Sequence, residues 1–356
     1  MINKKNALKT LKTLKPVTND KPALNNIAIM ENSLHYFSGE SQLIIEDIEK
    51  IDLHNIYSED NFFIDKEVFT KFYGKKDNCK IQKNEKNALL FSDITKLKIS
   101  NYDLYDFRNL YSGLNLKSDF IDINDSAELN KKIVECSKFA NQDKNRYSLN
   151  CVKLDFQNKM IVSTNQIVLK INYYSDFFTT EDIFLTNDFN ISLSDIKTLK
   201  TLDYDKIQLS EDAKYVIFSG ENFKFIVQNI ETQFPQYKNA FENFKNNPTI
   251  NFQNSELKQM INDLKMVSCE YNKIALFNGE NFKLSSPIGE IIINLDYKGI
   301  DLSIFNKDGI TGINIFYIEE YLKLKNENFS IYFSGSKKPL IIEDINGLFF
   351  MSPASI

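Results

Sequence analysis

The strongest constraint on the fold is an internal repeat, in which one pattern of apolar and polar residues occurs three times. The first occurrence is Leu24–Ile29, followed by a serine and a second apolar run, Leu43–Ile45. The pattern recurs at Leu149–Leu154 and at Tyr271–Leu276. Repeats so far apart are whole domains, not the short units of a solenoid. The sequence therefore predicts three similar domains, spanning 1–117, 118–245 and 246–356.

Each repeat has the same predicted order of elements: a helix, several alternating strands with Asn or Gly turns, a second helix and two more strands. In the first helix, Leu8, Leu11 and Leu14 form an apolar stripe. The predicted fold class is α+β, with three tandem domains in which two helices back mostly antiparallel sheets. The first helices are predicted at Asn3–Lys15, Ser126–Ala140 and Asn254–Cys269, and the second helices at Lys66–Tyr73, Leu193–Leu202 and Phe316–Leu324.

Composition places the chain among ordinary globular proteins, with 356 residues, 42% of them apolar and 26% charged. The four cysteines are scattered without a CxxC motif, which argues against disulfides. The sequence has neither a signal peptide nor an apolar run long enough to cross a bilayer. We therefore expect a cytoplasmic protein.

The basic residues are almost all lysine, since Arg108 and Arg146 are the two arginines, and the net charge is −5. A run of lysines on one helix usually indicates only a solvated face. Here, however, corresponding helices of all three repeats carry lysines beside the apolar stripe. Lysine contacts phosphate without reading bases, so this placement favours sequence-independent contact with duplex DNA.

The second repeat ends in the segment Gln233–Phe241, which follows the strand-like run Phe223–Val227. Pro235 fixes its own φ angle and disfavours a helical conformation at Phe234. The segment is therefore predicted to be an extended loop.

Four segments carry a resemblance to a known family. Lys21–Leu24 resembles a basic-Pro-Thr-Leu segment, Gln142–Asn150 a QD…RYYLN segment, Phe234–Tyr237 an FPDY segment, and Phe349–Ile356 a tail ending in a Met-Pro pair. All four belong to the β subunit of bacterial DNA polymerase III, the ring-shaped sliding clamp. They occur in the family's order, and the resemblance covers nearly the whole chain.

The resemblance implies three clamp domains per chain and a head-to-tail homodimer, whose ring has helices lining the hole and sheets outside. It also implies that a clamp loader opens the ring around double-stranded DNA. The polymerase catalytic subunit and repair proteins would dock through a short peptide with a glutamine and a Leu-Phe pair. No catalysis, cofactor, metal or membrane is implied, and the protein would be cytoplasmic and associated with the nucleoid.

The resemblance also implies roles for particular residues. The peptide pocket, between the second and third domains, would be lined by Leu149, Thr164, Leu169, Pro235, Ala240, Pro339, Leu340, Ser352, Pro353 and Ala354. DNA would be contacted by Lys9, Lys21, Lys132, Gln142, Arg146, Tyr147, Lys200 and Lys258. The dimer interface would pair Leu97 and Ile99 with Met266 and Val267.

Simpler structural roles fit some of these residues too. Leu97 and Ile99 alternate as they would in a strand facing its own core. Tyr147 equally fits a buried strand aromatic, and Lys21 an ordinary turn lysine before a proline.

The sequence departs from the family pattern at the pocket. Where the family has Thr-Asp-Gly-His-Arg-Leu, this chain has Thr164–Leu169, so the glycine and the basic pair are missing. Asn239 replaces an arginine and Ser148 replaces a tyrosine. The preferred peptide is therefore left open.

Catalytic motifs are lacking. The two histidines, His35 and His54, lie near no cysteine or other histidine, and we expect them at the surface or in turns. No glycine-rich phosphate-binding loop has the required spacing. The pairs Glu46-Asp47 and Glu343-Asp344 are predicted to be solvated strand ends.

Two alternative functions remain at this point. A clamp-like decoy would bind polymerase or loader peptides without encircling DNA, and it would be a monomer at micromolar concentration. A magnesium-dependent nuclease would depend on Asp47 or Asp344.

Overall fold

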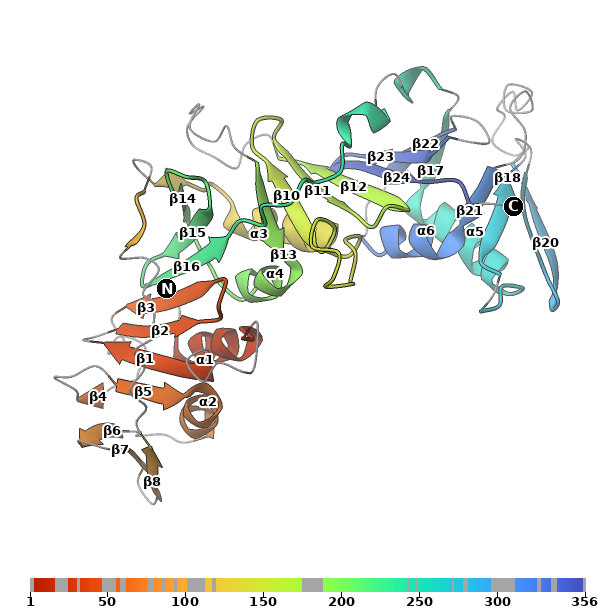
Figure 1. Ribbon diagram of the computed structural model, residues 1–356. Coiled ribbons are helices and arrows are strands. Elements are labelled where there is room, and N and C mark those ends of the chain that lie inside the picture. Colours follow the sequence, from red (N-terminus) through yellow and green to blue (C-terminus); the bar gives the residue numbers. More distant parts are fainter. Residues whose placement is uncertain are drawn as a thin grey trace. The chain divides into compact units, whose positions relative to one another are not determined.

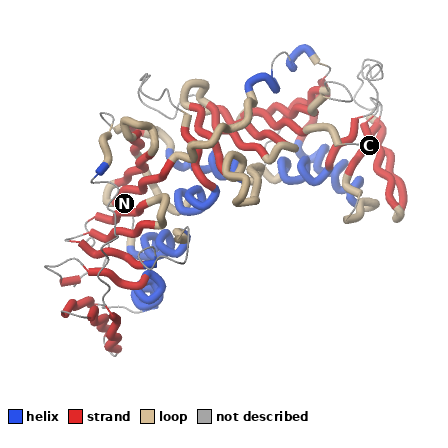
Figure 2. The backbone as a smooth tube through the Cα atoms, viewed as in Figure 1, coloured by secondary structure: helices blue, strands red, loops and turns tan. Residues whose placement is uncertain are grey.

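Two compact units make up the computed structural model of the chain. Unit 1 comprises Met1–Val134, Cys151–Lys159 and Tyr174–Thr232, and unit 2 comprises Glu135–Asn150, Met160–Tyr173 and Gln233–Ile356. The structure describes residues 3–16, 25–30, 33–46, 56–57, 62–75, 80–84, 87–92, 95–100, 113–116, 120–174, 188–241, 244–247, 249–270, 272–277, 281–295, 311–324, 328–333 and 338–354 (Figure 2).

An eight-stranded antiparallel sheet forms the centre of unit 1 (Figure 1). Its strands lie in the order β5-β1-β2-β3-β16-β15-β14-β9. They are β1 (Asn26–Met30), β2 (Ser33–Phe37), β3 (Gln42–Glu46), β5 (Phe62–Asp65), β9 (Ile121–Asp122), β14 (Lys206–Leu209), β15 (Tyr215–Gly220) and β16 (Phe223–Gln228). Unit 1 also holds a four-stranded sheet of β4 (Ile56–Tyr57), β6 (Lys80–Asn84), β7 (Asn87–Ser92) and β8 (Thr95–Ser100), and the pair β10 (Cys151–Asp155) and β13 (Phe189–Ser192).

Unit 2 contains a run of antiparallel strands in the order β11-β12-β24-β23-β22-β17 and a second sheet in the order β20-β19-β18-β21. The first run comprises β11 (Met160–Thr164), β12 (Val168–Tyr173), β17 (Thr249–Gln253), β22 (Asn328–Tyr332), β23 (Leu340–Asp344) and β24 (Gly347–Met351). The second sheet comprises β18 (Ile274–Phe277), β19 (Asn281–Ser286), β20 (Gly289–Asn294) and β21 (Thr311–Asn314).

The described residues form six α-helices, two for each repeat, as the sequence predicted. The first helices are α1 (Lys4–Thr13), α3 (Ser126–Ser137) and α5 (Asn254–Lys265). The second helices are α2 (Lys66–Lys75), α4 (Leu193–Leu199) and α6 (Ile315–Leu322). The first helices end two to four residues before their predicted ends. At α1 the cause is Leu14, whose extended backbone stops the helix ahead of Pro16.

Helix α1 shows why these segments form amphipathic helices. The Asn3 side chain accepts the Asn6 amide at 2.9 Å and caps the first turn. Leu8 and Leu11 are buried, and the helix packs against α2 and α4. The contact with α4 includes a hydrogen bond from the Thr13 hydroxyl to the Thr198 hydroxyl at 3.1 Å. These burials stabilise the helix far more than its intrinsic propensity does.

The core of unit 2 lies between its helices and sheets. Leu257, Ile261 and Leu264 of α5 pack with the buried face of α6 and with inward-facing strand residues such as Ile331. Each fully buried Leu or Ile contributes roughly 1.5–3 kcal/mol. The predicted architecture of helices backing mostly antiparallel sheets is therefore confirmed.

Backbone pairing joins one repeat to the next. In unit 1, β3 of the first repeat pairs with β16 of the second, with Leu43 opposite Phe225. In unit 2, β12 of the second repeat pairs with β24 of the third, with Leu169 opposite Phe350. Each junction joins the third strand after the first helix of one repeat to the last strand of the following repeat, so the threefold sequence pattern is also a pattern of strand pairing.

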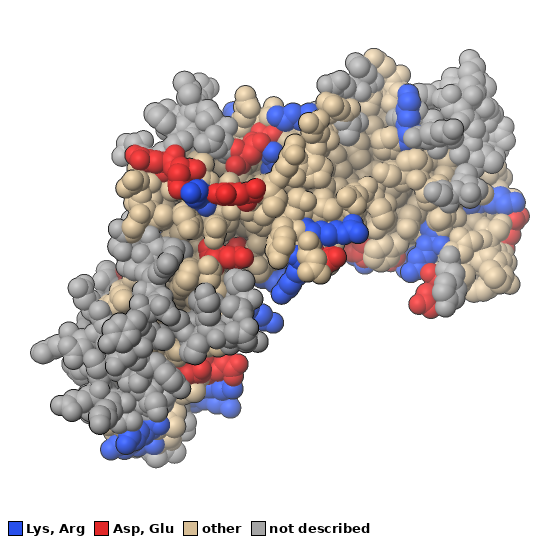
Figure 3. Space-filling view, in the orientation of Figure 1, with Lys and Arg blue, Asp and Glu red and all other residues tan. Residues whose placement is uncertain are grey.

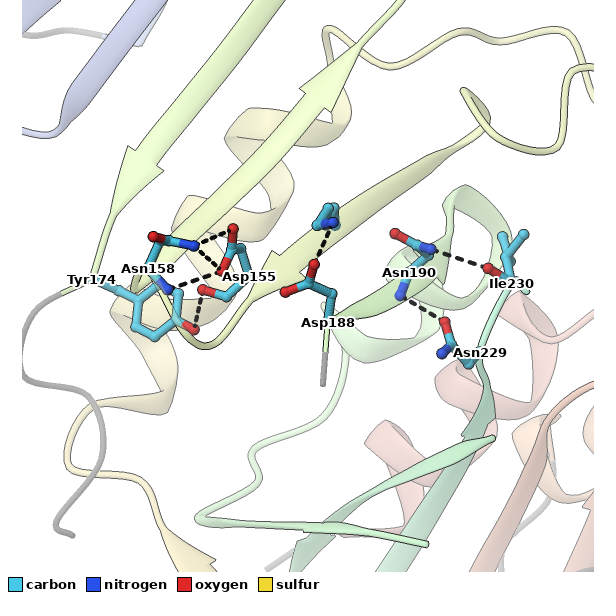
Figure 4. Close-up of polar contacts among 8 residues, drawn as sticks. Asp155, Asn158, Tyr174, Asp188, Asn190, Asn229 and Ile230 are labelled. Carbon is cyan, nitrogen blue, oxygen red and sulfur yellow. Dashed lines mark hydrogen bonds and ion pairs between the residues drawn. The ribbon is translucent and has the colours of Figure 1, made fainter. Parts of the chain in front are cut away.

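Polar side chains close the ends of β10 and β13 in unit 1 (Figure 4). The buried Asp155 carboxylate accepts hydrogen bonds from the backbone and side-chain amides of Asn158 at 2.8–2.9 Å. These bonds give the buried carboxylate oxygens hydrogen-bond partners within the turn. Asn190 bridges to the chain that follows β16, because its side chain donates to the Ile230 carbonyl at 3.0 Å and its backbone amide donates to Asn229 at 2.9 Å.

His35 is buried in β2, so the prediction of a surface or turn position was wrong for this residue. Its Nε2 lies 2.7 Å from the Ser33 hydroxyl and its Nδ1 lies 3.3 Å from the Gln42 side chain. A neutral imidazole with a polar partner at each nitrogen can be buried at modest cost. His54 lies outside the described residues.

Gly347 allows β24 to approach β12 closely. Its φ is +156°, and a Cβ atom there would lie 2.0 Å from the Ile171 carbonyl oxygen. Gly347→Ala should therefore lower the free energy of unfolding by at least about 2 kcal/mol, measured by urea denaturation. Gly113→Ala is the matched control, because a Cβ there would meet no atom within 4 Å. Equal stability of the two variants would contradict this account of the junction.

Two buried titratable groups in unit 1, His35 and Asp195, should change the free energy of unfolding with pH in opposite directions. Burial lowers the pKa of His35 from 6.5 to about 4, so protonation of the unfolded chain reduces stability as pH falls through this range. Burial raises the pKa of Asp195 from 3.8 to about 6, so this carboxyl increases stability as pH falls through its own range.

Asp195→Asn should therefore lose stability more steeply than the parent between pH 6.5 and 4.5, and His35→Gln should lose it less steeply. Each variant should depart from the parent by about 2 kcal/mol over this interval, in opposite directions, so the two variants should differ from each other by about 4 kcal/mol. Urea denaturation at several pH values measures both slopes, and parallel profiles for the three proteins would refute the assignment.

Candidate functional site

The junction of β12 and β24 carries several candidate pocket residues, and it places them on two faces. Leu169 is opposite Phe350, and Val168 is opposite Met351. Because strand side chains alternate, Leu169 and Phe350 share the face that we call the outer face. Val168 and Met351 point the other way, into the core that contains α5 and α6.

The outer face has an exposed apolar strip at the end of this junction. The Ser352 amide donates to the Ile167 carbonyl at 2.8 Å, which continues the pairing past the ends of both strands. Ile167 is 48% exposed, and Leu169 and Pro339 are half-buried. These residues can contact an apolar side chain from another molecule, with the exposed Ser352 as a polar neighbour.

The remaining pocket candidates are spread over this region of unit 2. Leu340 belongs to the core, because it is in register with Met351 and packs near Leu257. The buried Thr164 hydroxyl donates to the Val168 carbonyl at 2.6 Å and closes the hairpin between β11 and β12. Leu149 is buried, Pro235, Pro353 and Ala354 are half-buried, and the side chain of Ala240 lies outside the described residues.

The hairpin tip between β11 and β12 keeps a glycine-like backbone. Gln166 has φ +78° at the position where the family pattern has glycine, so the turn retains its left-handed residue at some conformational cost. The Gln166 side-chain oxygen accepts Arg146 Nη1 at 3.2 Å, and Arg146 Nε lies 3.9 Å from Asp143. The rim of the strip is therefore polar, with one positive side chain held beside it.

Three aromatic residues near the strip were missed from the sequence. Phe350 lies on the outer face, and the edge of the Phe244 ring contacts it with centroids 6.4 Å apart. Tyr317 at the start of α6 accepts the Asn165 side-chain amide at 3.4 Å. The period-two alternation of Phe349–Met351 could have identified Phe350 as facing away from the core, but Phe244 and Tyr317 have no such sequence signal.

A buried charged cluster lies beneath the same junction. Lys170 is fully buried in β12, with its Nζ 3.9 Å from an Asp344 carboxylate oxygen and 5.3 Å from the centre of the Tyr321 ring. Asp344 also accepts the Tyr321 hydroxyl and the Asn346 and Gly347 amides. The predicted solvated strand end was therefore wrong for Asp344, because turn amides and a tyrosine replace water around its carboxylate. Asp47 lies outside the described residues.

The candidate DNA-contact residues are mostly exposed. Lys9 lies on α1, Lys200 caps α4 and Lys258 lies on α5, whereas Lys132 on α3 is half-buried. Gln142 and Arg146 are exposed, and Tyr147 is 63% exposed, which excludes the buried strand aromatic. Lys21 lies outside the described residues. Among the described residues on the face drawn in Figure 3, basic and acidic side chains occur together in each unit.

The candidate dimer residues lie on β8 and at the end of α5. Leu97 on β8 is half-buried, and the side chain of Ile99 lies outside the described residues. Met266 is exposed after the last turn of α5, whereas Val267 is half-buried and packs against the core of unit 2. Ile288 and Ile292, on and beside the neighbouring strand β20, are exposed as well.

Tandem α+β repeats that continue one another's antiparallel sheets define the fold class of the DNA clamps. The chain has this fold along its full length. It is similar to the DNA polymerase III β subunit of Thermotoga maritima, with a TM-score of 0.77 at 14% identity, covering 99% of this chain and 97% of that one. For the β subunit of Pseudomonas aeruginosa the TM-score is 0.77 at 15% identity, with 100% and 99% covered. For the β subunit of Streptococcus pyogenes it is 0.75 at 15% identity, with 100% and 99% covered.

No protein-family model and no curated protein sequence matches the chain, so the likeness is one of fold. Among the described helices, none is long and apolar enough to span a membrane.

The charged cluster beneath the junction gives a testable consequence. Lys170→Ala should lower the free energy of unfolding by about 3–5 kcal/mol, because the buried Asp344 carboxylate loses its nearby cation. Asp344→Asn in the same chain should recover part of this loss, since it removes the uncompensated charge. Urea denaturation of both variants measures the effect, with Lys258→Ala as an exposed control. Additive losses in the double variant would show that the two residues do not interact.

Proposed function

We propose that the chain is a DNA sliding clamp, a non-catalytic processivity factor that encircles duplex DNA and tethers a polymerase. The observation that carries this proposal is the clamp fold, which extends over the whole chain. Three domains, at 1–117, 118–245 and 246–356, would each contribute two helices to the inner surface of a ring. Exposed lysines such as Lys9, Lys200 and Lys258, on or at the end of a helix from each repeat, support this arrangement.

Closure of the ring would follow the pairing rule of the two internal junctions. By that rule, β20, the third strand after the first helix of the last repeat, pairs with β8, the last strand of the first repeat, in a second chain. In the described part of the chain, β20 pairs with β19 alone and β8 with β7 alone. An edge strand left open invites such pairing.

Side chains around these edges support a head-to-tail homodimer. Met266 and Ile292 expose apolar surface beside or on β20, which a partner would cover. Lys96 and Lys98 are exposed on β8, whereas Glu290 on β20 already pairs with Lys283 of its own chain at 2.7 Å. The exposed apolar side chains are therefore the support for this pairing.

The mechanism is topological. A closed ring cannot leave the duplex sideways, so weak phosphate contacts are sufficient and allow sliding. The tethered polymerase then meets the primer end at a high effective concentration, because its second binding event is intramolecular. A clamp loader would open the ring, and the polymerase and repair proteins would bind through short peptides at the outer-face strip.

Ring closure on circular DNA tests the proposal. Protein loaded on nicked circular plasmid by a bacterial clamp loader should survive a high-salt wash and should dissociate after the plasmid is linearised. Gel filtration of the bound fraction measures both outcomes.

Ile292→Asp should sediment as a monomer and should not be retained on the circle, because it places a charge on the β20 edge. Ile345→Asp is the control, since Ile345 is 93% exposed in the turn between β23 and β24 and belongs to neither edge strand. A parent protein that is monomeric at micromolar concentration would favour the peptide-binding decoy. Loss of the parent from closed circles at high salt would contradict the proposed function.

A further inference from the structure

Large side chains of the chain itself fill much of the outer face near the strip. From β12 to β22, the register places Leu169, Phe350, Ile341 and Tyr332 in one row. Phe350 is 3% exposed and Ile341 is also buried. The middle of this row therefore offers almost no surface to another molecule.

Phe244 covers that middle part. Its ring forms T-shaped pairs with the rings of Tyr332 and Phe350, with ring centroids 4.9 Å and 6.4 Å apart. The Phe244 side chain is 6% exposed. Because Tyr332 and Phe350 flank Ile341 in the row, Phe244 lies above Ile341. Edge-to-face aromatic pairs of this kind contribute roughly 0.5–1.5 kcal/mol each beyond their burial, so the ring is held in place.

Among the described residues of β12, β24 and β23 on the outer face and at its end, the accessible apolar surface is then the short strip of Ile167, Leu169 and Pro339, next to Ser352. An aromatic anchor has to bury about 150–250 Å² to contribute its full binding energy. A phenylalanine that entered along the row would meet the Phe244 and Phe350 rings, whereas a leucine can cover Ile167 and Leu169 without displacing either ring.

We propose that this site selects a peptide with an aliphatic anchor, and that Phe244 is the residue that excludes an aromatic one. The inference rests on the proposed function, because it concerns the peptide site of the clamp. It assigns a narrower ligand than the Leu-Phe pair that the resemblance implies.

Two fluorescein-labelled peptides that contain a glutamine and end in Leu-Leu or Leu-Phe test this selection by fluorescence anisotropy. The full-length parent should bind the Leu-Leu peptide roughly tenfold more tightly, the range expected for a pocket that discriminates by size. Phe244→Ala should remove or reverse the preference, because it opens the space above Ile341. Ile345→Ala should leave it unchanged.

Phe244→Leu provides the same test with less loss of packing if circular dichroism shows that Phe244→Ala is unfolded. Equal affinity of the parent for both peptides, or an unchanged preference in the folded Phe244 variant, would overturn the inference. Failure of the parent to bind either peptide would instead remove the proposed peptide site, so the two failures can be told apart.

Discussion

Main-chain hydrogen bonding between repeats is the interaction on which the rest of the structure depends. At β3–β16 and at β12–β24, the third strand after the first helix of one repeat meets the last strand of the next repeat, and the sheets continue from one repeat to the other. A ladder of hydrogen bonds between strands pairs the backbone N–H and C=O groups whatever side chains the strands carry. This explains how the clamp fold persists at 14–16% identity to the solved clamps.

Side chains determine which strands pair at each junction and in which register. At β12–β24, Gly347 admits the backbone of β12, and Lys170, Asp344 and Tyr321 form a buried charged cluster. A shift of the register by one residue would move Lys170 to the outer face and separate it from Asp344. In unit 1, the buried His35 and Asp195 stand near β3–β16. Buried polar groups of this kind contribute little net stability, but they disfavour every pairing that leaves them without partners.

The same junction that carries the buried cluster also carries the candidate peptide site on its opposite face. Alternation along β12 sends Lys170 inward and Leu169 outward, so stability and recognition use adjacent residues of one strand. The site is shaped by its own chain, since Phe244 returns over the sheet and covers part of the apolar row. The proposed ring and its peptide partners thus depend on a single type of strand pairing, used twice within the chain and once between chains.

Much of the architecture follows from local sequence. The apolar stripe of Leu8, Leu11 and Leu14 and the threefold recurrence of the Leu24–Ile29 pattern are local signals, and they identified the six helices and the α+β class. Only the tertiary structure decided which strands pair with one another and which side chains this pairing buries. His35 and Asp344 look like solvated polar residues in the sequence, yet both are buried. Ser33 and Gln42 lie at the two ring nitrogens of His35, and Tyr321 and the amides of the following turn donate to the Asp344 carboxylate. Leu340 is likewise assigned to the core only by strand register. Phe244 lies in a short 3-10 helix, and only its ring contacts with Tyr332 and Phe350 place it over the outer face. Periodicity defines two faces of a strand but does not say which part of the chain covers each face.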